Sequence, residues 1–374
     1  MLKIGLSVGL ILSLAGAASA QETPATPAPA KEPAAKQPAA KTEPSLKVGD
    51  KAPALSVEKW VKGEPITGFE KGKVYVVEFW ATWCGPCIAQ FPHLSELQSE
   101  YKDKGLTIIG TNIWEDAHGM PPYSDETLAN VKDFVKEQGP RMEYHVAYDG
   151  GTKAMDKNWM KAAGRNGIPS AFVVDQNGVV VYADHPMFLD VVIDDVLAGK
   201  WDPKTGSEKV KKLQDDYMSL FRKSRTDAKG ALADWEKFEK DYPKFAAHQS
   251  DMKLRLLMSA GEWDEAYKVM GKQVDAAIKA KDSAQLNALA WGIVDPEAKV
   301  EKRDVDLAMR AAKEAVQLTN EKDGAILDTL ARCYWLKGDK AKAIETQKKA
   351  VAVATPQFKD QLEETLDEYQ KDAK

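Results

Sequence analysis

Residues 74–87 read VYVVEFWATWCGPC and decide how the first half of this chain folds. The run Val74–Trp80 is apolar and rich in β-branched and aromatic residues, which predicts a buried strand. Cys84 and Cys87 follow where a helix is expected to begin. Two thiols at this spacing can close a small disulfide ring, and N–H groups at a helix N-terminus stabilise the thiolate of the first. Because the thiolate is the attacking species in thiol–disulfide exchange, the stretch predicts a redox-active disulfide, Cys84–Cys87.

The same cysteine spacing also occurs in zinc sites and in structural disulfides. A structural zinc site needs about four ligands. The sequence has three cysteines and five scattered histidines, with no second Cys-x-x-Cys and no His-x-x-x-His. We therefore expect no metal ligands and no cofactor. Cys333 lies far from the pair, and we expect it to be a buried apolar residue.

The segment Val76 to Pro92 resembles thioredoxin-fold proteins, and more closely the TlpA-type and redoxin-type thiol–disulfide oxidoreductases. Pro92 stands five residues after Cys87, where these proteins kink the active-site helix. The loop Gly167-Ile168-Pro169 is similar to the one that holds their cis-proline. The resemblance covers residues 47–200 and implies a thioredoxin-like α/β fold. It also implies that Cys84 attacks a substrate disulfide and that Cys87 resolves the mixed disulfide.

The resemblance further implies which residues contact the substrate. Trp83, Gly85 and Pro86 belong to the motif itself and are expected to form part of the substrate-binding surface. Ile168 is expected to offer its backbone to an extended substrate chain beside Pro169. A Gly-Pro pair between the cysteines resembles the reducing members of the fold, so a reductase is preferred to an oxidase. The family then implies a membrane thiol transporter as the electron donor.

Glu78 is the candidate catalytic carboxylate. It stands six residues before Cys84, where thioredoxins have a buried aspartate. Many TlpA-type proteins instead carry a glutamate three residues after the second cysteine, a position held here by Gln90. A carboxylate inside the sheet would have a raised pKa through desolvation and could take the proton from Cys87. The alternative is a strand residue facing water; we favour the catalytic role because strands within α/β sheets are covered on both faces.

The N-terminal 46 residues predict targeting and linker segments. Residues 1–20 have the layout of a secretory signal peptide, with the apolar stretch Ile4 to Ala17 and the small-residue site Ala18-Ser19-Ala20. We expect cleavage before Gln21 and a periplasmic or otherwise extracytoplasmic location, with an uncleaved membrane tether as the alternative. Residues 21–46 hold six prolines and no aromatic residue, which predicts a disordered linker.

After Trp201-Asp202-Pro203 the sequence loses its β-rich runs and takes on helical spacing to the end. We therefore predict a thioredoxin-like domain at 47–203 and a helical-repeat domain at 204–374. Positions that match a tetratricopeptide unit, in which small residues let two helices pack closely, are Leu327, Leu330, Ala331, Tyr334, Gly338, Ala343 and Ala350. Ala308 and Ala315 recur 35 residues before the last two of these.

The partners follow from these two regions. Disulfide-bearing envelope proteins are the expected substrates, and stacked helix pairs commonly bind proteins on a concave surface. The helical region could instead be a packing or dimerisation element. A net charge of −5 and the absence of a basic cluster argue against nucleic acid. Two other classes stay open: a thiol peroxidase, although the Pro-x-x-x-Thr-x-x-Cys pattern is absent, and an interaction or scaffold protein whose repeats carry the function.

Overall fold

The computed structural model describes residues 44–373. The predicted signal peptide, residues 1–20, lies outside the described residues, as does the predicted linker up to residue 43. Leu46, at the end of that linker, is buried, and its N–H donates to the carbonyl oxygen of Ala162 at 2.9 Å. Leu46 therefore already packs with the redox domain, one residue before the predicted start of that domain at residue 47.

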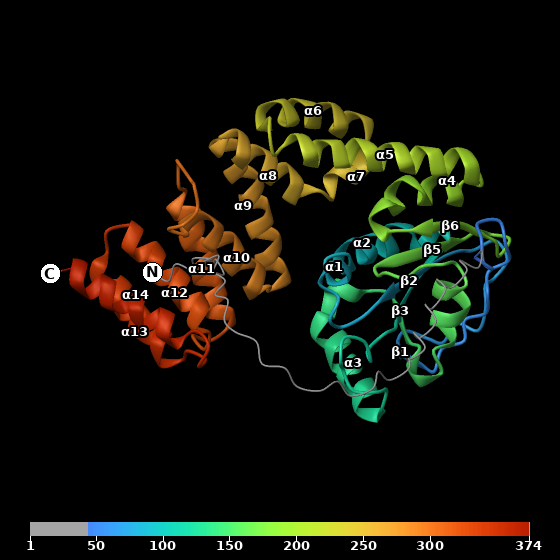
Figure 1. Ribbon diagram of the computed structural model, residues 1–374, viewed down its shortest axis with the longest axis horizontal. Helices are drawn as coiled ribbons and strands as arrows, with labels where there is room; N and C mark the ends of the chain where they lie inside the picture. The colour runs from blue at the N-terminus through green and yellow to red at the C-terminus, as the bar shows by residue number, and fades with distance from the viewer. Residues whose placement is uncertain (1–43, 374) are drawn as a thin grey trace, which may run out of the picture. The chain divides into compact units, whose positions relative to one another are not determined.

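A mixed six-stranded sheet forms the centre of the first part of the described chain, in the order β1-β4-β3-β2-β5-β6 (Figure 1). The strands are β1 (Lys59–Lys62), β2 (Val74–Trp80), β3 (Leu106–Asn112), β4 (His145–Tyr148), β5 (Ser170–Val174) and β6 (Val180–Asp184). β2, β3 and β4 are parallel neighbours, whereas β1, β5 and β6 pair antiparallel at the two sides. The predicted strand is confirmed as β2, and the architecture is thioredoxin-like.

Both faces of the sheet are covered, which explains why β2 is apolar throughout. All seven of its residues are buried. On one face, Val74, Val76 and Trp80 join an apolar cluster with residues of α2 and α3. On the other face, Tyr75, Val77 and Phe79 belong to the cluster that contains Trp159. Such double burial removes the usual alternation of polar and apolar residues. The helical segments of this part are α1 (Gly85–Ile88), α2 (Phe91–Tyr101), η1 (Lys102–Lys104), α3 (Asp125–Gln138), η2 (Gly139–Met142), η3 (Gly150–Thr152), η4 (Asp156–Lys161), η5 (Pro186–Val191) and α4 (Ile193–Leu197).

β5 and β6 form a hairpin around the Asn177-Gly178 turn. Gly178 has φ of 73°, a left-handed conformation that costs glycine no steric penalty. The Asp175 carboxylate accepts the N–H groups of Asn177 and Val179, both at 2.9 Å. The local turn chemistry is therefore sufficient to define this hairpin.

From residue 203 onward all regular structure of the described chain is helical. The helices are α5 (Pro203–Lys223), α6 (Ala228–Asp241), α7 (Pro243–Ala247), α8 (Ser250–Ala260), α9 (Trp263–Ala280), α10 (Ser283–Val294), α11 (Val305–Leu318), α12 (Gly324–Leu336), α13 (Lys340–Ala352) and α14 (Lys359–Asp372). Many begin after an aspartate whose side chain accepts a backbone N–H of the first turn: Asp202, Asp227, Asp282, Asp304, Asp323 and Asp339. Within the described part of the chain, no helix is long and apolar enough to cross a membrane.

The positions that resemble a tetratricopeptide unit lie in α12 and α13. Leu327, Ala343 and Ala350 are buried, and Gly338 adopts φ of 81° in the short turn between the two helices. Small side chains at such positions allow close helix packing. Cys333 in α12 is a free, fully buried thiol, and burial raises its pKa to about 12. The expectation that Cys333 is a buried residue is thus confirmed.

One apolar cluster continues across the division predicted at residue 203. It joins the sheet face that carries α2 with buried residues of α5, α6, α7 and α8. Phe188 of η5 stacks on Phe245 of α7 with ring centroids 5.7 Å apart. Residue 203 therefore marks a change from mixed to all-helical structure and not a break in the apolar core.

Candidate functional site

Cys84 and Cys87 lie just beyond the carboxyl end of β2, at the start of α1. Their sulfur atoms form a disulfide, and their Cα atoms are 5.3 Å apart. Cys84 is the N-cap residue of α1, and its Sγ accepts the N–H of Cys87 at 3.2 Å. Gly85 and Pro86 are exposed, whereas Cys84 keeps 3% of its surface accessible and Cys87 none. A partner approaching this edge therefore reaches Cys84 before Cys87.

Pro92 interrupts the helix that carries the motif, as the resemblance implies. The helix is divided into α1 and α2, and Pro92 lies in the first turn of α2. A proline there has no N–H to donate to the carbonyl four residues earlier, which belongs to Ile88. Arg141 supplies the missing donor, because its Nη2 donates to the Ile88 carbonyl oxygen at 3.3 Å. The kink thus keeps its backbone acceptor satisfied.

The segment before the cysteines is held by the loop that follows β3. The Glu115 carboxylate accepts the N–H of Thr82 at 2.7 Å and its hydroxyl at 2.6 Å, and also accepts the Asn112 amide at 2.6 Å. Trp83 donates its indole N–H to the carbonyl oxygen of Trp114 at 3.0 Å. β2 and β3 are parallel neighbours, so their carboxyl ends meet at one edge of the sheet. Glu115, in the loop after β3, therefore holds in place the segment that leads from β2 into the cysteine motif.

Trp83 presents its ring to a second residue of the same loop. His118 packs edge-on against it with centroids 4.5 Å apart. Both Trp114 and His118 have positive φ, at 58° and 56°. Side-chain-bearing residues rarely adopt this conformation, and it clusters at functional sites. The sequence motifs gave no sign of Glu115 or His118.

Glu78 is fully buried, which excludes the alternative of a strand residue facing water. Along β2 it shares a face with Val76 and Trp80, the face whose apolar cluster includes both cysteines. Among the described residues, its two carboxylate oxygens find no hydrogen-bond partner, and burial raises the pKa of Glu78 well above its usual value. Gly110 on β3 leaves room for the ring of Tyr144 beside this carboxyl, since a Cβ there would lie 2.8 Å from a Tyr144 ring carbon and 3.4 Å from Glu78 Oε2.

The Ile168–Pro169 peptide bond is cis, as the resemblance implies. Pro169 immediately precedes β5, whose Ser170 pairs with Phe79 near the end of β2. Ile168 packs against the apolar cluster that includes Cys84 and Cys87. The sheet therefore places this loop at the same edge as the disulfide.

The sequence assigned no role to the histidines, but the fold brings two of them together. His93 of α2 and His248, which follows α7, have ring centroids 4.4 Å apart, and both face Asp190 of η5. His248 and Asp190 come from segments far from the motif in sequence. Only the folded chain reveals this cluster.

Similar proteins belong to the class that the fold and the cysteine pair indicate. The sequence model of the Redoxin family matches residues 47–190. Protein FixW of Rhizobium leguminosarum is 31% identical over 157 residues, which cover 42% of this chain and 69% of FixW. Thiol:disulfide interchange protein HelX of Rhodobacter capsulatus is 33% identical over 165 residues, covering 42% of this chain and 82% of HelX.

Further relatives carry similar names. Thiol-disulfide oxidoreductase ResA of Bacillus anthracis is 33% identical over 137 residues, covering 36% of this chain and 68% of ResA. Among solved structures, a thiol:disulfide interchange protein of the thioredoxin family from Chlorobium tepidum TLS is 30% identical. It covers 36% of this chain and 84% of its own, with a TM-score of 0.27.

The fold and the disulfide at the end of β2 define a thioredoxin-fold protein with a Cys-x-x-Cys site. The chain belongs to the redoxin-type thiol–disulfide oxidoreductases, and its redoxin region is followed by helices α5–α14.

Proposed function

We propose that the protein is an extracytoplasmic reductase of protein disulfides that works through the Cys84/Cys87 pair. The observation that carries the proposal is the placement of this disulfide. Cys84 is the more accessible cysteine, caps α1, and stands beside the exposed Gly85-Pro86 backbone. The Gly-Pro pair favours the reducing direction because it resembles the reducing members of the fold.

The reaction has two exchange steps. In the reduced enzyme the Cys84 thiolate attacks one sulfur of a substrate disulfide, so that the substrate S–S bond breaks and a mixed disulfide forms. The first substrate thiolate leaves and takes up a proton. Cys87 then loses its proton and attacks the Cys84 sulfur, which closes the Cys84–Cys87 disulfide and releases the second substrate thiolate. Two electrons pass to the substrate, and a membrane thiol transporter is the donor class that would restore the dithiol.

Glu78 is proposed as the group that takes the proton from Cys87. A general base works best when its pKa lies near the operating pH. Burial raises the pKa of Glu78, and no hydrogen bond holds its carboxylate in one protonation state. Gln90 holds the position of the acid that many relatives use, and an amide cannot exchange a proton, so Glu78 is the remaining carboxyl suited to this step.

The substrate-binding edge is proposed to consist of Trp83, Gly85, Pro86, Ile168 and Pro169. Trp83 is held by the loop after β3, and the cis-proline loop lies at the same edge of the sheet. An extended substrate chain could pair with the Ile168 backbone while its disulfide faces Cys84. This arrangement would orient the substrate without a cofactor.

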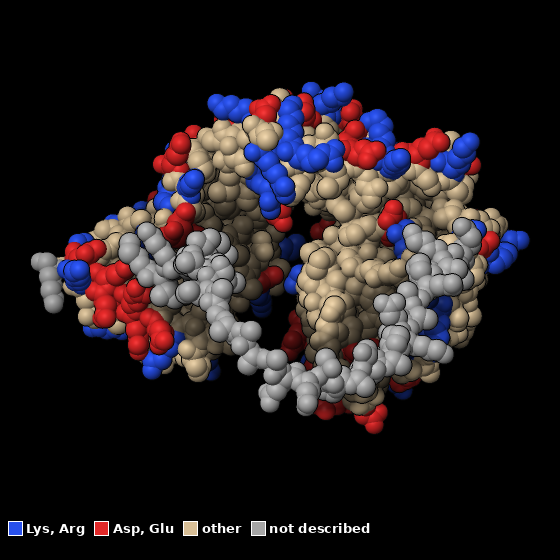
Figure 2. Space-filling view, in the orientation of Figure 1, with Lys and Arg blue, Asp and Glu red and all other residues tan. Residues whose placement is uncertain are grey.

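The two regions are proposed to divide the work. Residues 47–203 carry the chemistry, and residues 204–374 select partners as tetratricopeptide-like repeats. The signal-like residues 1–20 support export, and the proline-rich residues 21–46 support a linker role. On the face drawn in Figure 2, acidic and basic side chains are interspersed over α5 and α6, which suits contacts with proteins of mixed charge.

The decisive experiment compares single cysteine variants of the full chain in insulin reduction. Cys84→Ser should abolish the activity. Cys87→Ser should form a mixed disulfide with insulin that persists until an external thiol is added, because nothing resolves it. If Cys84→Ser accumulates the mixed disulfide and Cys87→Ser does not, the assigned roles are wrong. Equal insulin reduction by wild type and Cys84→Ser would reject the proposal, and rapid peroxide consumption by the reduced protein would favour the peroxidase.

A second comparison tests partner selection. A groove of about 920 Å³ between α6, α8 and α9 includes Glu236 and Glu265. Glu236→Lys with Glu265→Lys should leave reduction of oxidised glutathione unchanged and slow reduction of envelope proteins. Glu363→Lys on α14 serves as the matched charge control. Equal rates on every protein substrate would favour a structural or dimerisation role for the helices.

A further inference from the structure

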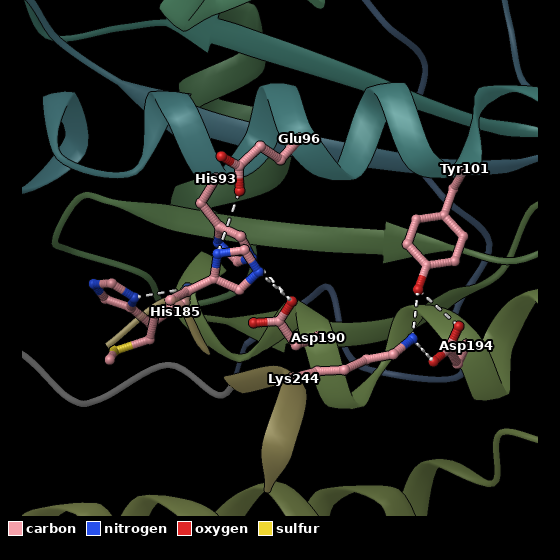
Figure 3. A network of polar contacts seen from close by, with 9 residues as sticks. His93, Glu96, Tyr101, His185, Asp190, Asp194 and Lys244 are labelled. Carbon is pink, nitrogen blue, oxygen red and sulfur yellow. Dashed lines mark hydrogen bonds and ion pairs between the residues drawn. The ribbon is translucent and has the colours of Figure 1, made fainter. Parts of the chain in front are cut away.

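His93 of α2, Asp190 of η5 and His248, which follows α7, converge in one cluster. Figure 3 labels His93 and Asp190 of this cluster. His93 Nε2 lies 3.0 Å from Asp190 Oδ1, and His248 Nε2 lies 3.7 Å from the same oxygen. One ligand atom from each residue lies within 4.8 Å of the other two. Imidazole nitrogen and carboxylate oxygen are the ligands that zinc accepts alongside thiolate.

The spacing of these atoms matches a metal centre. Bonds of about 2.0–2.1 Å around a tetrahedral ion place neighbouring ligand atoms about 3.3–3.5 Å apart. Two of the three separations, 3.0 and 3.7 Å, lie on either side of this value, and the third, between the two imidazoles, is within 4.8 Å. Side-chain rotations that bring the imidazoles closer together would place all three residues on one ion, with a water molecule as the fourth ligand.

An ordinary buried ion pair does not account for the whole arrangement. His93 alone would satisfy one oxygen of Asp190, yet His248 approaches the same oxygen. The second oxygen is buried and has no partner within residues 44–373. Asp190 keeps only 3% of its side chain exposed, so water does not satisfy it from bulk solvent. A buried carboxylate facing two imidazoles is well satisfied by a cation placed between them.

Glu96 gives His248 the orientation that a metal ligand needs. Its Oε2 lies 3.3 Å from His248 Nδ1. A proton on Nδ1 leaves the lone pair of Nε2 free and pointed toward Asp190. Histidines that bind metals commonly donate their other ring N–H to a carboxylate in this way.

Neighbouring contacts hold α7 in place, so the cluster is built before any ion arrives. Lys244 of α7 pairs with Asp194 and donates to the hydroxyl of Tyr101 at 2.8 Å (Figure 3). Phe245 stacks on Phe188. Since His248 follows these residues directly, its ring is positioned by contacts that need no metal.

We propose that His93, Asp190 and His248 form a binding site for a divalent transition metal, with zinc as the ion of best fit, and that Glu96 positions His248. The ion would join α2, which begins four residues after Cys87, to η5 and to the end of α7. It therefore acts as a structural clamp between the redox motif's helix and the helical region. No electron transfer is involved, because zinc has no redox chemistry.

The test is a calorimetric titration of ZnCl₂ into the full chain, made without a histidine tag, treated with chelator and kept in the disulfide form. The intact disulfide prevents Cys84 and Cys87 from binding zinc. One ion per chain should bind, and zinc should raise the thermal midpoint because it binds the folded state. His248→Gln should remove both effects, while Glu96→Gln should weaken affinity roughly 10-fold or more.

His118→Gln is the matched control, because this exposed histidine lies in the loop beside Trp83 and outside the cluster. It should bind zinc as the wild type does. His248 is about one-third exposed, so its replacement is expected to leave the fold intact, which circular dichroism without metal checks. Equal zinc affinity in wild type and His248→Gln would overturn the proposal. So would the absence of any thermal shift in the wild type at saturating zinc.

Discussion

The pH dependence of stability tests whether burial raises the pKa of Glu78. Its side chain is fully buried on the face of β2 that meets the cysteine cluster, and neither oxygen has a hydrogen-bond partner. Burial in a low-dielectric surrounding disfavours the charged carboxylate, so the pKa of Glu78 is raised above its ordinary value of 4.5. Glu78→Gln keeps the shape and removes the titrating group.

The sign and size of the effect follow from proton linkage. Below the unfolded-state pKa, Glu78 is protonated in both states and costs nothing further. As the pH rises above that value, the unfolded chain loses the proton while the folded chain keeps it. The free energy of unfolding then falls by about 1.4 kcal/mol per pH unit until the folded-state pKa is passed. Glu78→Gln lacks this loss, so its stability relative to wild type should grow with the same slope.

Urea unfolding of the disulfide form at pH 5, 6, 7 and 8, followed by tryptophan fluorescence, measures this difference. Other titrating groups cancel because both proteins share them. Glu364→Gln, at an exposed position of α14, provides the matched control for the substitution itself. A free-energy difference between wild type and Glu78→Gln that stays constant over this range would refute the raised pKa of the buried carboxyl. The pH at which the slope ends marks where folded Glu78 loses its proton, and a slope that continues unbroken to pH 8 would rule Glu78 out as the base.

Two further substitutions test the contacts that hold the motif. Glu115→Ala leaves the Thr82 N–H and the Asn112 amide without their acceptor, which should cost about 1–3 kcal/mol for each buried group. Urea unfolding should show this loss and insulin reduction should slow, whereas unchanged values would mean that Glu115 does not hold the loop. Arg141→Ala removes the donor to the Ile88 carbonyl and should cost about 1 kcal/mol by the same measurement, with Arg141→Gln retaining part of it. An unchanged unfolding midpoint would show that solvent replaces this bond.

Local sequence signals predicted the parts of the fold whose causes are local. The apolar run Val74–Trp80 became β2, the Asn-Gly pair made the β5–β6 turn, and the helical spacing after residue 203 became α5–α14. In each case the structure is determined by a few residues that are close in sequence, such as a run of β-branched side chains or a glycine with positive φ. The burial of Glu78 also followed from the rule that strands inside α/β sheets are covered on both faces.

The surroundings of the motif were beyond prediction because long-range contacts create them. Glu115 reaches Thr82 only because β2 and β3 are parallel neighbours, and Arg141 reaches Ile88 only because η2 packs beside α2. The usable signal for Glu115 lay outside the motifs: it is a polar residue shortly after the apolar run that forms β3, and parallel strands end at one edge of the sheet. Nothing comparable marks Arg141 in the sequence.

The change in sequence pattern near residue 203 marks a change of secondary structure. It does not mark a boundary between independently folding domains, because the helices after it pack on the redox region. The contacts of α7 with the redox region are of three kinds. Lys244 pairs with a carboxylate of α4, Phe245 stacks on an aromatic ring of η5, and His248 meets a histidine of α2. Phe245 is fully buried between Phe188 of η5 and the rings of Tyr217 and Phe238 on α5 and α6. Removing the chain after residue 203 would expose the apolar surface that Phe245 covers and leave the Asp190 carboxylate without one of its imidazoles. The helices nearest the sheet therefore complete the core on which the redox motif rests, whatever partners the later helices bind.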